Sequence, residues 1–263
     1  MRADKYFAER YGSRTKAAEA IEKGLVLVNG KRIKPKDEVD ENSAVDFVQA
    51  EESFVSNGGY KLARAIKAFE FDCKDKIFAD IGASTGGFTD CLLQNGAKKV
   101  YAVDVGESLL HDSLATDTRI VRMENSNARY LKNTDFADQL NGVVADVSFI
   151  SLRLILPVIK EIISENGDAF VLIKPQFECE NKRIGKSGIV RFESHPKIAE
   201  KVVGYAEENG LYAFGIVNAP LRKGKNIEYI LWLKRTAKHA RSAKQIAEEV
   251  KKLVKSNALG ELE

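Results

Sequence analysis

ADIGASTGGFTD, residues Ala79–Asp90, is the stretch that decides how this chain folds. The apolar residues of Lys76–Ala79 lead into it as a buried strand would, and Phe88–Leu93 has the apolar spacing of a helix's inner face. The turn between them contains three glycines, Gly82, Gly86 and Gly87. Glycine lets the backbone turn tightly and approach a ligand closely, and the first N–H groups of a helix point outward. The stretch therefore predicts a strand, a ligand-binding turn and a helix.

The next predicted strand, Lys99–Val105, carries Asp104 near its end, 24 residues after Asp80. An acid at that place can accept hydrogen bonds from the hydroxyl groups of a ribose. The turn Gly82–Gly87 reads GxxxGG, which fits neither the GxGxxG turn of dinucleotide sites nor a phosphate-binding loop. A nucleoside cofactor without phosphates fits better, and an ordinary strand–turn–helix corner is the alternative. The pattern DxGxxxGGF resembles S-adenosylmethionine-dependent methyltransferases of the FtsJ type.

Composition limits the class of protein. The 263 residues are 44% hydrophobic and 30% charged, with a net charge of +3, which suits one α/β domain and a smaller one. No apolar run approaches the roughly 18 residues of a membrane span, and the charged N-terminus has no secretory signal pattern. The three cysteines lie far apart and the three histidines lack metal-ligand spacing. We expect a cytoplasmic monomer with reduced thiols, no metal site and no membrane partner.

The first fifty residues predict a small α+β unit. Tyr6–Lys23 has apolar faces for two short helices broken near Gly12, and an apolar strand leads to a hairpin turn at Asn29-Gly30. The order RxD, SRxxA and IxxGxVxVNG, over roughly Arg2–Phe47, resembles the small RNA-binding domain named after ribosomal protein S4. We place this domain at residues 1–48, a linker at 49–56 and a second domain at 57–263.

This resemblance implies contacts between the small domain and RNA phosphates. The residues expected to make them are Arg2, Arg14, Lys16, Asn29, Lys31 and Arg32. Such contacts supply affinity that depends on salt and carries no sequence choice. A solvated basic face is the alternative interpretation.

The rest of the chain alternates predicted strands and helices. Strands are expected at Arg119–Glu124, Gly142–Asp146, Ala169–Lys174, Leu211–Val217 and Ile227–Leu233, and helices at Tyr60–Phe69, Leu152–Ile163 and Pro196–Glu208. This alternation predicts a mostly parallel sheet covered on both faces, closed by an antiparallel pair, as in the Rossmann-like α/β sheet of class I methyltransferases. Ligands bind beyond the carboxyl ends of such strands, so Asp146 and Lys174 should lie beside the glycine turn.

Seven motifs in order carry a more specific resemblance. They are GGYKL, DIGASTGGFTD, AVDVG, NAR, ADVSFIS, KPQFE and GKNIEY, with GKSGIVR at residues 185–191 before the last. Together with the N-terminal unit, they closely resemble the TlyA family of ribosomal RNA 2′-O-ribose methyltransferases, often labelled haemolysins. The resemblance implies methyl transfer from S-adenosylmethionine to a ribose 2′-hydroxyl of ribosomal RNA within a ribosomal subunit, at a cytidine.

The same resemblance implies the residues of the site. The Lys-Asp-Lys-Glu tetrad of FtsJ-like relatives falls on Lys61, Asp146, Lys174 and Glu228. The cofactor is expected at Asp80, Gly82, Ser84, Gly86, Gly87, Phe88, Asp104, Asn127 and Asp146. A ribose hydroxyl is a poor nucleophile that must lose its proton as it attacks, and Lys174 is the best candidate for the general base. Lys61 would act electrostatically, and the two acids would hold the lysines. Surface ion pairs are the alternative interpretation of Lys61 and Glu228.

Two other functions compete with the enzyme. A non-catalytic protein that binds RNA or ribosomes would keep both kinds of motif, but it would not need all four tetrad positions filled. A membrane-lytic haemolysin would need an amphipathic or apolar membrane segment. The best candidate, Arg241–Val254, has apolar residues at ordinary core spacing and charges of both signs opposite them, which predicts a packed terminal helix.

Overall fold

The computed structural model describes residues 1–22, 24–40, 42–47, 53–179, 188–222 and 224–260. The chain divides into two compact units, Met1–Ser53 and Phe54–Glu263. The first half of the predicted linker 49–56 and the first residues of the GKSGIVR motif lie outside the described residues.

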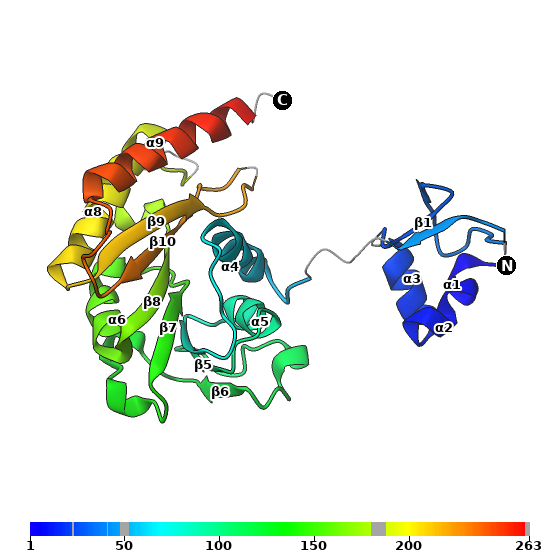
Figure 1. Ribbon diagram of the computed structural model, residues 1–263, viewed down its shortest axis with the longest axis horizontal. Coiled ribbons are helices and arrows are strands. Elements are labelled where there is room, and N and C mark those ends of the chain that lie inside the picture. The colour runs from blue at the N-terminus through cyan, green and yellow to red at the C-terminus, as the bar shows by residue number, and fades with distance from the viewer. Residues whose placement is uncertain (23, 41, 48–52, 180–187, 223, 261–263) are drawn as a thin grey trace. The chain divides into compact units, whose positions relative to one another are not determined.

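The small unit is three short helices packed on a three-stranded sheet (Figure 1). Its elements are α1 (Ala3–Tyr6), α2 (Ala8–Tyr11), α3 (Arg14–Glu22), β1 (Val26–Val28), β2 (Lys31–Arg32) and β3 (Val45–Phe47). The predicted hairpin turn is confirmed, because β1 pairs with β2 and Asn29 and Gly30 have φ values of 53° and 72°. The two short helices predicted within Tyr6–Lys23 are confirmed as α2 and α3, and α2 ends just before Gly12, whose φ is 78°. Helix α1 precedes them and was not predicted. The backbone leaves helical geometry at Phe7, whose ring is buried in the small core, and this break separates α1 from α2.

The large unit is a seven-stranded sheet with helices on both faces. Its helices are α4 (Asn57–Ala68), α5 (Gly87–Gln94), α6 (Leu156–Ile162), α7 (Pro175–Glu178), α8 (His195–Glu208) and α9 (Ala243–Gly260). Its strands are β4 (Ile77–Ile81), β5 (Lys99–Val103), β6 (Ile120–Met123), β7 (Leu140–Ala145), β8 (Ile163–Ile173), β9 (Tyr212–Asn218) and β10 (Tyr229–Lys234). The strand order is β6-β5-β4-β7-β8-β10-β9. The first five strands of this order are parallel and β10 is antiparallel to both neighbours, so the predicted fold class is confirmed.

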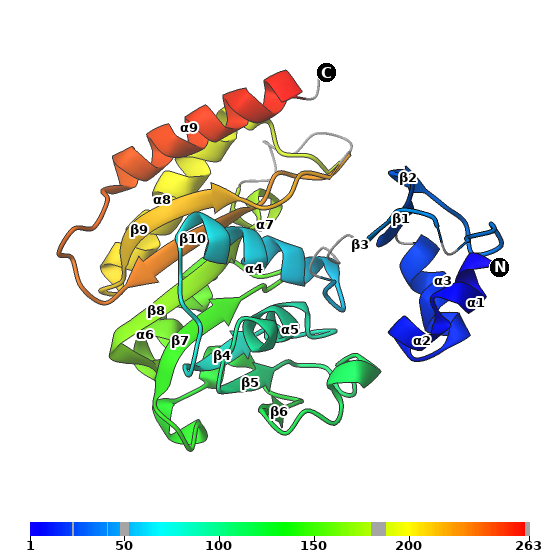
Figure 2. The same cartoon turned by 45° about the vertical axis from the view of Figure 1, so that its right-hand side comes forward.

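Alternating residues of the strands supply two separate cores. On one face, Phe78 and Phe170 pack under α4 and α5, and on the other Ile81 and Val171 pack under α6 and α8 (Figure 2). The helix predicted at the C-terminus is α9, which packs on α8 and buries Ile246. None of the described helices has the length and apolar character needed to cross a membrane.

The predicted boundaries around residue 160 are wrong. Leu152–Leu154 is a 3₁₀ turn, α6 covers only Leu156–Ile162, and β8 begins at once, six residues before its predicted start. A proline, which lacks an N–H group, stands in the first turn of α6 and suits only a helix start. An irregular register with β7 lets the polar residues at the start of β8 extend the strand.

Candidate active site

The four predicted tetrad residues meet at one end of the sheet. Asp146 stands at the centre, with its Oδ1 2.6 Å from Lys174 Nζ and its Oδ2 3.3 Å from Lys61 Nζ. Lys61 Nζ also lies 2.8 Å from Glu228 Oε2. The side chains are only 10–19% exposed, so this is a largely buried chain of alternating charges and not a set of surface ion pairs.

The strand order explains why these residues meet. Asp146 and Lys174 each follow the last residue of a parallel strand, and β7 and β8 are neighbours, so both side chains reach the same edge. Because β10 runs antiparallel to β8 and Tyr229 pairs with Ile173, the preceding Glu228 arrives opposite Lys174. Lys61 comes from the second turn of α4, which packs on that face of the sheet.

The charges around Lys61 fix its protonation state. Burial lowers the pKa of Lys61, but the carboxylates of Asp146 and Glu228 outweigh that effect and hold its pKa above the ordinary value. Lys61 is therefore a permanent ammonium in the physiological range. Lys174 has a further partner, because its Nζ donates to Ser148 Oγ at 2.6 Å.

The glycine turn lies directly against the tetrad. Gly82 has a φ of 81°, and a Cβ on it would lie 2.9 Å from the carbonyl oxygen of Asp146, so only glycine allows this approach. A Cβ on Gly87 would lie 2.2 Å from Ser56 Oγ. Ser84 N–H donates to Asp104 Oδ2 at 2.8 Å, which ties the turn to the end of β5. Turn, strand end and tetrad form one continuous surface.

Two cavities that share lining residues open on this surface. The larger, about 770 Å³, includes Gly82, Ser84, Asp104, Asn127 and Asp146 in its lining. The smaller, about 170 Å³, shares three of these residues and adds Gly87, Phe88 and Lys174. A ligand with ribose hydroxyls fits the larger cavity, because Asp104 supplies a carboxylate that has no cation partner among the described residues. Lys174 lines the smaller of the two cavities.

Asp80 and Gly86 do not line either cavity. Asp80 is fully buried, its Oδ2 accepts a hydrogen bond from Thr89 Oγ1 at 2.7 Å, and its Oδ1 has no partner among the described residues. Burial raises the pKa of Asp80 to about 7, although the hydrogen bond from Thr89 opposes the shift. An orphaned oxygen behind the glycine turn is compatible with a positively charged ligand, and the direct contacts of Asp80 and Gly86 stay predictions.

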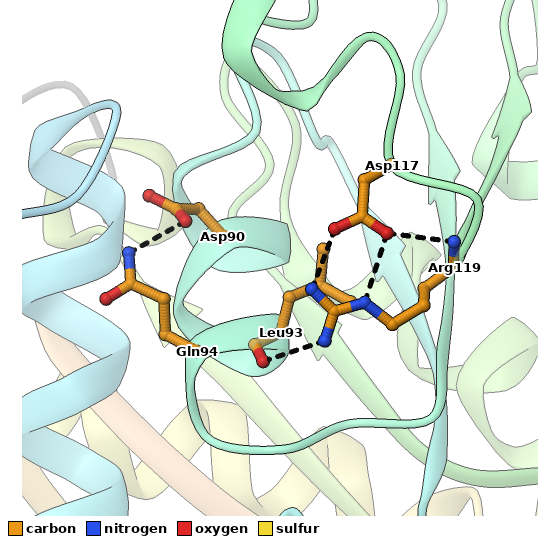
Figure 3. A network of polar contacts seen from close by, with 5 residues as sticks. All are labelled: Asp90, Leu93, Gln94, Asp117 and Arg119. Atoms are coloured by element: carbon orange, nitrogen blue, oxygen red, sulfur yellow. Dashed lines mark hydrogen bonds and ion pairs between the residues drawn. The ribbon is translucent and has the colours of Figure 1, made fainter.

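Helix α5, which presents Gly87 and Phe88 to the cavity, is held near both ends. Asp90 in its first turn accepts a hydrogen bond from Gln94 Nε2 (Figure 3). It also accepts one from the backbone N–H of Val55. At its last turn, Arg119 donates to the carbonyl oxygen of Leu93 at 3.2 Å while its guanidinium also binds Asp117 (Figure 3). The first turn of α5 is thus anchored independently of any ligand.

The predicted RNA-binding residues of the small unit are all exposed. Arg2 and Arg14 meet at Asp4 Oδ2, at 2.9 Å and 3.1 Å. The others lie on α3 and around the hairpin turn: Lys16, Asn29, Lys31 and Arg32. A joint role in binding RNA stays a prediction.

Comparison with protein families identifies both units. The model of the FtsJ-like methyltransferases matches residues 54–235, and the model of the S4 domain matches residues 1–45. The chain belongs to the FtsJ-like methyltransferase family. The predicted family resemblance is confirmed, and the cavities beside the glycine turn belong to a methyltransferase.

Individual relatives agree with this assignment. The provisionally named rRNA methyltransferase YqxC of Bacillus subtilis is 43% identical over 84% of this chain and 80% of its own length. The 16S/23S rRNA (cytidine-2'-O)-methyltransferase TlyA of Mycobacterium tuberculosis is 37% identical over 92% of both. The solved structure of a provisionally named hemolysin from Streptococcus thermophilus is 37% identical, covers 98% of both chains and superposes with a TM-score of 0.72.

Sequence reasoning missed three residues around the methyltransferase site. Ser148 binds Lys174, Phe149 is 92% exposed beside it, and Glu178 holds the loop that carries both. Ser148 and Phe149 lie in the ADVSFIS motif, directly after Asp146, so their position was the available signal. Glu178 closes KPQFE, but nothing in that motif indicates its partners.

Proposed function

We propose that this methyltransferase transfers a methyl group from S-adenosylmethionine to the 2′-hydroxyl of a ribose in ribosomal RNA. The observation that carries the proposal is the buried chain Lys174–Asp146–Lys61–Glu228, which stands where the cavity of the glycine turn ends. S-adenosylmethionine is the cofactor and supplies a methyl group activated by its sulfonium. Gly82, Ser84, Asp104 and Asn127 would hold it, since they line the larger cavity.

Lys174 is the residue that takes the proton of the attacking hydroxyl. In its neutral form, Nζ accepts the proton from the ribose oxygen, while Asp146 and Ser148 fix the direction of the amine. Lys61 stays charged and stabilises the negative charge that develops on the oxygen, and Glu228 holds Lys61 in place. The remaining contribution is positioning, because both reactants bind to one rigid strand edge.

The identity of the substrate rests on relatives and on the small unit. The Mycobacterium tuberculosis relative is named for cytidine in 16S and 23S rRNA, and we propose a cytidine here as well. The S4 domain, with its exposed arginines and lysines, supplies phosphate contacts and thereby affinity. A ribosomal subunit as the true substrate, a monomeric enzyme and a cytoplasmic location complete the proposal.

Mass mapping of ribose methylation tests this function. Ribosomal RNA from a strain that lacks the protein should miss a 2′-O-methyl group, and the purified wild-type protein should restore it on isolated subunits with S-adenosylmethionine. Lys174→Ala protein serves as the matched inactive control. Methylation on a base instead of a ribose, or full restoration by Lys174→Ala, would contradict the proposal.

A further inference from the structure

Glu178 is a buried carboxylate that stands next to the tetrad without belonging to it. It is the last residue of α7 and only 4% exposed. Its Oε2 accepts a hydrogen bond from Ser151 Oγ, and its Oε1 accepts one from the backbone N–H of Leu152, both at 2.7 Å. A buried carboxylate that receives two short hydrogen bonds restricts the groups that donate them.

These bonds close a ring between two segments. The catalytic loop, Asp146–Ser151, follows β7, and the short segment from Lys174 to Glu178 follows β8. At one end, Lys174 Nζ contacts Asp146 and Ser148. At the other end, Glu178 holds the last residue of the same loop and the residue after it. Asp146, Ser148 and Lys174 are therefore aligned from both sides.

The catalytic loop requires such a fixed end. Phe149 has a φ of 62°, a left-handed conformation that bulky residues adopt rarely, and its side chain is 92% exposed. The ring of Phe177 lies beside it, with the two ring centroids 5.2 Å apart. Strained backbone persists only where its surroundings over-determine it, and here the two ends of the loop supply that constraint.

The anchor itself is fixed. Lys201 Nζ on α8 donates to the carbonyl oxygen of Glu178 at 2.9 Å, so the end of a four-residue helix is attached to a fourteen-residue one. Motion of α7 would otherwise carry Glu178 and Lys174 together. Helix α8 therefore holds Glu178, and Glu178 in turn holds the catalytic loop.

We propose that Glu178 is a positioning residue for methyl transfer, which holds the catalytic loop so that Asp146 and Ser148 keep Lys174 aligned with the attacking hydroxyl. This rests on the proposed function of Lys174. Glu178 touches neither the cofactor cavities nor the tetrad, so its effect passes through the loop. The shape of its two hydrogen bonds matters more than its charge.

Three substitutions at Glu178 separate shape from charge. Glu178→Gln keeps one acceptor for Leu152 and an amide that can donate to Ser151 Oγ, so kcat should stay near wild type. Glu178→Asp keeps the charge but is one methylene shorter, and Glu178→Ala removes the contacts. Both should lower kcat by about 10- to 100-fold through misalignment, with cofactor affinity changed far less. Exposed Glu161→Ala is the matched control.

Hydrogen exchange gives a readout that does not depend on activity. In Glu178→Ala, the amides of residues 146–152 should exchange faster while those of β7 and β8 keep their protection. Ser151→Ala removes the bond to Glu178 Oε2 and also the bond that Ser151 Oγ accepts from the backbone N–H of Arg153. Because the first of these is already lost in Glu178→Ala, the double variant should lose little further kcat.

Several results would overturn the proposal. They are wild-type kcat in Glu178→Ala, an active Glu178→Asp beside an inactive Glu178→Gln, or unchanged loop exchange despite lost activity. An equal loss of cofactor affinity and kcat would also contradict it. If wild-type protein methylates no ribosomal RNA, the proposed function fails, and loop exchange still decides whether Glu178 holds the loop.

Discussion

Each unit of this molecule contains one carboxylate that two cations share. In the small unit, Asp4 binds Arg2 and Arg14, whose side chains are 53% and 57% exposed. In the large unit, Asp146 binds Lys61 and Lys174, whose side chains are 16% and 10% exposed. The geometry is alike, but one arrangement faces water and the other faces a cavity.

This difference shows why arginines suit the exposed arrangement and lysines suit the buried one. Arginine keeps its charge and presents several donors in a plane, so Arg2 and Arg14 can bind Asp4 and still offer N–H groups to a phosphate. The hydrogen bond from Arg2 holds the pKa of Asp4 below its ordinary value, so the carboxylate stays charged and orients both arginines. Lysine can lose its proton, which an arginine cannot, and the proposed role of Lys174 in the buried arrangement needs that property.

The largest effect is expected from substitutions of Lys174, which disrupt the buried arrangement. Lys174→Ala should lower kcat by about 10²- to 10⁴-fold, the usual cost of losing a general base, with cofactor binding almost intact. Lys174→Arg should be nearly as damaging, because a guanidinium keeps the charge but accepts no proton. Single-turnover methylation rates and calorimetry of cofactor binding measure the two effects.

Lys61→Arg is the matched variant for this test. It should be milder, since Lys61 acts as a fixed positive charge. Near-normal turnover in Lys174→Arg would make Lys174 a positioning charge, and Asp146 would then be the next candidate for the base.

The second effect concerns a carboxylate without a cation. The Asp104 carboxylate accepts hydrogen bonds only from the backbone N–H groups of Ser84 and Gly106 among the described residues, which leaves acceptor capacity for ribose hydroxyls. Asp104→Ala should weaken S-adenosylmethionine binding by about 10- to 100-fold, the value of hydrogen bonds to a charged group. Calorimetry measures this, with Asp112→Ala as an exposed control. Equal affinity in Asp104→Ala, or tighter binding of NAD, would refute the assignment.

The third effect tests the exposed arrangement. Arg2→Ala combined with Arg14→Ala should weaken RNA binding by about tenfold and reduce the slope of log affinity against log salt by roughly 1.5, if each arginine contacts one phosphate. Cofactor affinity should stay unchanged. Filter binding across salt concentrations measures the slope, and Lys251→Ala on α9 is the control. An unchanged slope would show that these arginines only hold Asp4.

The smallest effect extends the comparison to Asp80, a buried carboxylate that has no cation partner among the described residues. Because its pKa is about 7 in the folded protein and near 4 when unfolded, the folded state binds the extra proton between these values. Stability from this group is therefore present at low pH and falls as the pH rises from about 4 to 7. Asp80→Asn cannot titrate at this position, so it does not lose this stability as the pH rises. Without cofactor, the melting temperature of Asp80→Asn relative to wild type should therefore increase by several degrees between pH 5 and pH 8. Parallel melting curves would contradict the assignment, and Asp72→Asn is an exposed control.

The sequence predicted what short-range rules and the strand order determine. The Asn29-Gly30 hairpin, the glycine turn and the mostly parallel sheet follow from local residue chemistry and period, and the structure has all three. The meeting of Asp146 and Lys174 follows from parallel strand ends. Lys61 and Glu228 could be assigned only through the family resemblance, because no local pattern says which helix or hairpin reaches that edge.

The rest depended on contacts between loops. The bonds of Glu178 to Ser151 and Leu152 join positions 27 and 26 residues apart in the chain, and no periodicity encodes them. The early start of β8 depended on a register irregularity with β7, which propensity cannot show. The predicted residue boundaries of the two domains remain a prediction.

The position of β10 between β8 and β9 has a consequence for synthesis of the protein. The strands that carry the glycine turn, Asp104, Asp146 and Lys174 leave the ribosome in that order, and their parallel sheet can form as they emerge. Glu228 is the last tetrad residue to be made, and it reaches Lys61 only when the strand that follows it inserts beside β8. The proposed tetrad is therefore complete only after the final hairpin has been made, later in synthesis than the strands that carry the proposed cofactor surface.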